Sequence, residues 1–116
     1  MTIDPQNLTL LCLNAKDHEL DESSNVLIHK LTGNPANDDP IRLELGNITA
    51  ERFAIAARRA AILGGGNFTP PEPADVNALQ SAIADVHNAV VSSADVVTMM
   101  GLTAKLLSQY GAAKSH

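Results

Sequence analysis

Histidine is the side chain best suited to acid–base and metal chemistry near neutral pH, and this chain has four. They are His18, His29, His87 and His116. No two of them have the spacing of a metal site, and His18, in an expected turn, lacks an oriented partner for catalysis. We therefore predict no catalytic residue, no metal site and no cofactor, and we interpret His87 as a surface or interface residue.

Two further features could carry chemistry but favour structural roles. Cys12 is the single cysteine and lies in an apolar stretch, which predicts a buried, inert thiol and excludes a disulfide scaffold. Gly64, Gly65 and Gly66 follow an expected helix and lead into prolines, whereas a phosphate-binding loop leads into a helix. We interpret these glycines as a helix stop and hinge.

A local basic cluster, Arg52, Arg58 and Arg59, could bind an acidic partner or lipid headgroups. The chain as a whole is acidic, with a formal net charge of -5, so a solvated helix face is the favoured interpretation. The same balance excludes a typical nucleic-acid binder, because phosphates require a basic surface. The first residues have no basic run followed by an apolar segment, so we expect a cytoplasmic protein.

The 116 residues fit one domain, residues 1–116, and 45% of them are apolar, which excludes a disordered tail. Aromatic residues make up only 3%, which favours extended helical packing over an aromatic-lined ligand pocket. Turn-forming residues at 32–40 and a Gly/Pro-rich spacer at 64–73 divide the chain into three segments.

The first segment fits two kinds of element. Asp4 and Pro5 form a helix start, yet Leu8, Leu10 and Cys12 alternate as in a strand. The best strand candidate is Ile41–Leu45, at the start of the middle segment, where apolar and polar residues alternate. A small antiparallel sheet from residues 7–46 would give an α+β fold. The middle segment predicts a helix over Thr49–Leu63, capped by Thr49 and ended by Gly64. Its expected apolar stripe is Phe53, Ala56, Ala60 and Leu63.

The C-terminal segment predicts a helix over 74–110, because it has no proline and only one glycine before Tyr110. Two series of residues recur in it at intervals of seven, which is the pattern of a coiled-coil seam. The residues that flank this seam are small or uncharged, which favours a multi-helix bundle over a simple dimer. The series are Val76, Ile83, Val90, Val97 and Ala104, and Leu79, Val86, Ser93, Met100 and Leu107.

We therefore expect a mainly α fold, with a long C-terminal helix packed on a shorter helix as a bundle or hairpin, unless the long helix breaks near Ser92 and Ser93. The leading functional hypothesis is a non-enzymatic structural or protein-interaction protein that forms a homo-oligomer through this seam. The predicted interface residues are Val76, Leu79, Ile83, Val86, Val90, Val97, Met100 and Leu107.

Two alternatives remain. One is a small-molecule-binding protein or small enzyme with the α+β fold, whose candidate polar groups are His29, Arg42, Glu44 and Arg59. The other is a membrane-active helical protein, since residues 89–107 are strongly apolar. Asp95 disfavours insertion of that segment into a bilayer.

Overall fold

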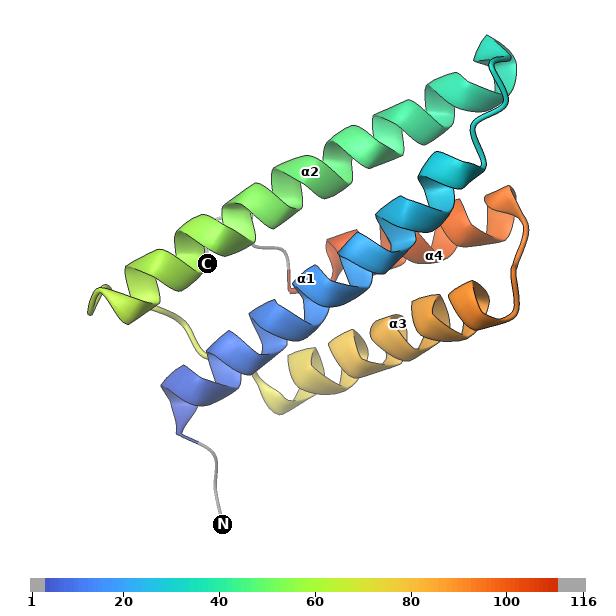
Figure 1. The fold of residues 1–116 in the computed structure, drawn as a ribbon. Coiled ribbons are helices and arrows are strands. Elements are labelled where there is room, and N and C mark those ends of the chain that lie inside the picture. The colour runs from blue at the N-terminus through green and yellow to red at the C-terminus, as the bar shows by residue number, and fades with distance from the viewer. Residues whose placement is uncertain (1–3, 111–116) are drawn as a thin grey trace.

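A computed structural model describes residues 4–110, and these residues form four helices and no strand. The helices are α1 (Pro5–His29), α2 (Pro35–Leu63), α3 (Pro73–Val91) and α4 (Val96–Ser108) (Figure 1). The mainly α prediction is confirmed for this part of the chain. The alternative with an antiparallel sheet from residues 7–46 is wrong, because that stretch lies in α1, the following loop and the first half of α2.

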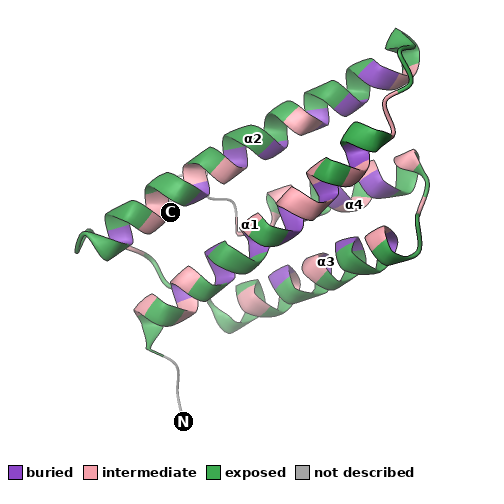
Figure 2. Cartoon of the chain, in the orientation of Figure 1, coloured by how far each residue is buried: buried purple, intermediate pink, exposed green. Residues whose placement is uncertain are grey.

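Consecutive helices run in opposite directions, and α1 lies at the centre of the arrangement (Figure 1). α1 contacts the three other helices, whereas α2 contacts α1 and α4 but not α3. The molecule is elongated and thin, with extents of 47 × 25 × 17 Å. α2 is therefore an outer helix, and one of its long sides faces solvent (Figure 2).

The core of α1 and α2 is built from residues spaced seven apart. They are at most 2% exposed, and they are Leu13, Leu20 and Leu27 of α1 and Ile41, Ile48, Ile55 and Ile62 of α2. This spacing explains why the strand predicted at Ile41–Leu45 is wrong. Ile41 belongs to the helical stripe of isoleucines, while Leu43 is 69% exposed, so the alternation in this short stretch does not define a buried face.

α2 ends at Leu63 as predicted, but it begins at Pro35 rather than at Thr49. The Asn34 side chain caps its first turn by accepting a hydrogen bond from the backbone N–H of Ala36, at 3.1 Å. Pro35 occupies the first helical position, where a missing N–H costs nothing. The turn formers at 32–40, which were expected to divide two segments, therefore include the N-cap and first turn of this helix.

The apolar stripe predicted for α2 lies on the wrong side of the helix. Phe53 is 79% exposed and Leu63 is 68% exposed, and Ala56 and Ala60 are exposed as well. Ile55 and its heptad equivalents face α1 instead, because an isoleucine side chain buries more apolar surface in the core than an alanine side chain does. The apolar residues of the predicted stripe are thus left open to solvent, on a helix with a long exposed side (Figure 2).

The predicted long C-terminal helix over 74–110 is wrong, since the chain breaks at residues 92–95 and folds back as a hairpin of α3 and α4. Ser93 has a φ of +56°, and the backbone N–H of Ala94 bonds to the carbonyl of Ala89 at 3.0 Å, which ends α3. Asp95 then caps α4 by accepting a hydrogen bond from the Thr98 N–H at 2.8 Å. The last helix has only 13 residues.

The break divides the predicted seam. Leu79 and Val86 are buried in the core of the same chain, so their side chains are not open to contact with a second chain. In α4 the core positions are one residue away from the predicted series, at Met99 and Leu106. Val97 is 77% exposed, and the remaining predicted interface residues are partly buried against the core: Val76, Ile83, Val90, Met100 and Leu107.

Candidate functional site

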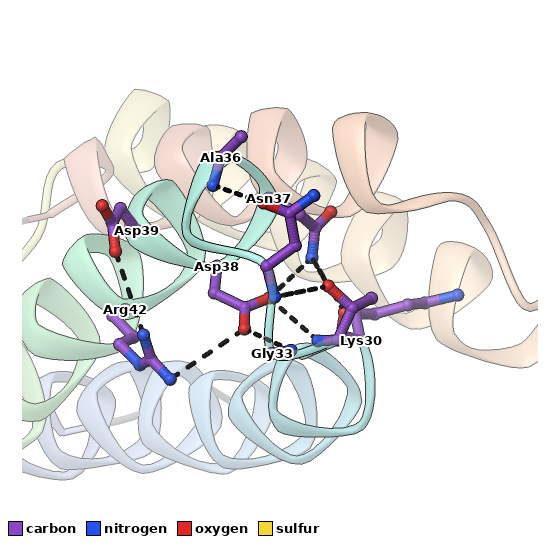
Figure 3. A network of polar contacts seen from close by, with 9 residues as sticks. Lys30, Gly33, Ala36, Asn37, Asp38, Asp39 and Arg42 are labelled. Atoms are coloured by element: carbon purple, nitrogen blue, oxygen red, sulfur yellow. Dashed lines mark hydrogen bonds and ion pairs between the residues drawn. The ribbon is translucent and has the colours of Figure 1, made fainter.

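A buried carboxylate closes the loop between α1 and α2. Asp38 accepts hydrogen bonds from the backbone N–H groups of Thr32 at 2.9 Å and Gly33 at 2.7 Å, and from the Asn37 side-chain amide at 2.8 Å (Figure 3). Gly33 has a φ of +87°, a conformation that glycine adopts without strain. The Thr32 N–H, the Asn37 amide and the other donors lower the pKa of Asp38. This network is structural, because its donors are already satisfied within the loop.

We expect Asp38→Asn to be less stable than the parent chain at pH 7, and this difference to shrink as the pH falls below about 4. The pKa of Asp38 is lower in the folded chain, so its contribution is complete above the unfolded pKa and disappears as the pH falls through the folded value. Urea unfolding at a series of pH values measures the difference. Asp39→Asn is the control, because that side chain is 73% exposed, and an equal effect of both variants would contradict the prediction.

A buried lysine joins three helices. Lys16 of α1 is fully buried and pairs with the Glu51 carboxylate of α2. Its ammonium also donates to the carbonyl oxygens of Leu107 at 3.1 Å and Gln109 at 2.8 Å. These carbonyls lie at the end of α4, where the helix itself supplies no donors, and a cation there complements the helix dipole. Lys16 thus fixes the end of α4 against α1 and α2.

Further polar contacts hold α1 to its neighbours. The Ser23 hydroxyl hydrogen-bonds the Thr103 hydroxyl of α4 inside the core. One carboxylate oxygen of buried Glu19 has no hydrogen-bond partner within residues 4–110 and lies 3.6 Å from His87 Nδ1 on α3. His87 is an exposed residue, in agreement with its interpretation as a surface histidine.

The polar groups proposed for a small-molecule site do not converge. His29 is exposed at the end of α1, where its Nδ1 lies 2.7 Å from the Asn25 carbonyl. Arg42 is exposed on the first half of α2 and pairs weakly with Asp38 at 3.9 Å. Glu44 and Arg59 line two different grooves, one on each side of α2.

The basic cluster is divided in the same way. Arg52 pairs with Asp17 at 2.9 Å and with Asp21 at 3.0 Å, so its charge is balanced by α1.

Cys12 is buried, as predicted, and burial raises the pKa of its thiol. Within residues 4–110, no group of three or more acidic, histidine or cysteine side chains could hold a metal ion.

The feature best placed to receive another molecule is an open groove between α2 and α4, with a volume of about 380 Å³. Glu44 lies in it and is only 8% exposed. No ion pair or hydrogen bond from the described residues reaches its carboxylate, and burial raises its pKa. The groove is lined by Glu44, Asn47, Ala50 and Glu51 of α2 and by Ala104, Leu107 and Ser108 of α4.

Sequence reasoning named Glu44 and Leu107 but did not bring them together. The pattern that could have placed them together is the series of isoleucines spaced by seven in α2. This series identifies the face of α2 that packs against α1 and α4.

Residues 4–110 form an all-helical bundle in which one side of the outer helix α2 is exposed. No family model, no curated protein and no solved structure matches the chain. Among residues 4–110, no helix has both the length and the apolar character required to cross a membrane.

Proposed function

We propose that the chain is a non-enzymatic structural or protein-interaction protein that forms a homo-oligomer. The observation that carries the proposal is the open side of α2, where Phe53 is 79% exposed in the middle of a face of alanines. Scattered exposed apolar residues are normal, but a contiguous apolar helix face of this kind is typical of an interaction surface.

Two residues of the predicted heptad series lie beside α2. Leu107 lines the groove beside α2, together with Ala104, the next residue of the same heptad series. Self-association through this surface retains a contribution from the C-terminal helix. It does not require Leu79 or Val86, which belong to the intramolecular core.

Light scattering coupled to size-exclusion chromatography at two protein concentrations tests the proposal. We expect a mass above 12.2 kDa that rises with concentration. A stable monomer at high micromolar concentration would contradict it.

A further inference from the structure

We propose that Glu19 of α1 and His87 of α3 form a pH-sensitive latch, an ion pair that joins the two helices when the imidazole ring of His87 takes up a proton. The proposal does not depend on self-association through α2, because α3 has no contact with that helix. It starts from a carboxylate oxygen that the fold buries without a partner.

Glu19 is the acidic half of the latch. The residue is only 5% exposed, and its Oε1 atom is buried with no hydrogen-bond partner among residues 4–110. No other buried side-chain nitrogen or oxygen atom in this part of the chain is left in that condition. Burial of a polar atom without a hydrogen bond costs free energy, so a donor that reached this oxygen would stabilise the packing of α1 against α3.

His87 is placed to become that donor. Its Nδ1 atom lies 3.6 Å from Glu19 Oε1, which is too far for a hydrogen bond. A neutral imidazole has a hydrogen on only one ring nitrogen, whereas the protonated ring has one on both nitrogens and carries a positive charge. The His87 side chain is 63% exposed and has room to turn toward the buried carboxylate. Protonation therefore converts a near contact into a charge-assisted hydrogen bond.

The charged groups around His87 are compatible with a proton on its ring. α3 packs against α1 and α4. On the α1 side the charged neighbours are Glu19 and Glu22, which lines a groove between α1 and α3, and both are acidic. On the α4 side, Lys105 lies 3.9 Å from Asp85, which is two residues before His87 and so points to another side of α3.

The latch makes the chain more stable at mildly acidic pH than a chain without His87. A histidine that gains a partner only when it is charged contributes stability that is complete below about pH 6.5, where a free histidine is protonated. This contribution is lost as the pH rises and the ring loses its proton. Because glutamate ordinarily stays ionised down to about pH 4.3, the ion pair is present at about pH 5.5 and absent at about pH 8.

A double-mutant cycle at two pH values tests the latch. Glu19→Gln and His87→Gln are made singly and together in the full chain. Urea unfolding followed by circular dichroism gives the unfolding equilibrium constant of each variant at about pH 5.5 and about pH 8. The measured quantity is the factor by which the effects of the two substitutions fail to multiply. We expect this factor to be at least about three at the acidic pH and about one at the alkaline pH.

His18→Gln is the matched control, because it makes the same substitution at an exposed histidine next to Glu19, and adjacent side chains of a helix do not face each other. Its cycle with Glu19→Gln should give a factor of about one at both pH values. A Glu19–His87 factor that is the same at both pH values, or no larger than the control, overturns the latch.

If Glu19→Gln does not fold, the single histidine variants decide the question. The ratio of the unfolding constants of His87→Gln and the parent should change at least about threefold between the two pH values, and the ratio for His18→Gln should stay nearly constant. An unchanged ratio for His87→Gln overturns the latch.

Discussion

Replacing Lys16 with methionine is expected to lower the free energy of unfolding by about 3–5 kcal/mol. The ammonium group is fully buried and bonds to the Glu51 carboxylate and to two carbonyl oxygens at the end of α4. Methionine fills similar space but removes all three contacts, and it leaves the Glu51 charge in the interior without its ammonium. Urea unfolding followed by circular dichroism measures the loss.

Two variants make this prediction specific. Lys105→Met removes an exposed lysine whose contact with Asp85 spans 3.9 Å, so it should change stability by less than about 1 kcal/mol. The double variant Lys16→Met with Glu51→Leu should recover much of the loss, because an apolar pair leaves no buried charge. A Lys16→Met variant as stable as Lys105→Met would show that the interior does not contain this ion pair.

Ile55→Ala is expected to cost about 2–5 kcal/mol, whereas Phe53→Ala should change the stability of the dilute monomer by less than about 0.5 kcal/mol. Ile55 is fully buried against α1, and Phe53, two residues earlier on the same helix, is 79% exposed. Thermal unfolding at low micromolar concentration separates folding stability from self-association. If Phe53→Ala lowered the free energy of unfolding more than Ile55→Ala does, the side of α2 that carries Phe53 would be the side that packs against α1.

The helical class, the end of α2 at Gly64 and the burial of Cys12 could be predicted from the sequence, because capping residues and apolar spacing act locally. The face of α2 could not be chosen from its second half alone. Phe53, Ala56 and Ala60 are spaced by three and four residues, and Ile48, Ile55 and Ile62 are spaced by seven, so each set lies on one face of a helix. Only the full length of the helix, from Ile41 onward, distinguishes the two faces.

The polar part of the core was missed for a different reason. Thr9, Lys16 and Ser23 recur every seven residues in α1, and all three are buried. Threonine, lysine and serine are typical of a protein surface, so their spacing by seven predicts an exposed face of α1 as long as their hydrogen-bond partners are unknown. Those partners, Glu51 and Thr103, come from helices far along the chain. The C-terminal break was signalled by Ser92–Asp95, where a helix end is followed by an N-cap residue.

The most direct measurement for the account is the mass of the chain as a function of concentration, compared between the parent and a Phe53→Glu variant. Phe53 is 79% exposed on the open side of α2, so a charge at this position should weaken self-association without unfolding the monomer. We expect sedimentation equilibrium to give a mass that rises with concentration for the parent and a lower mass for Phe53→Glu at the same concentration. A parent that stays monomeric, or a variant with the same mass as the parent, would contradict self-association through the open side of α2.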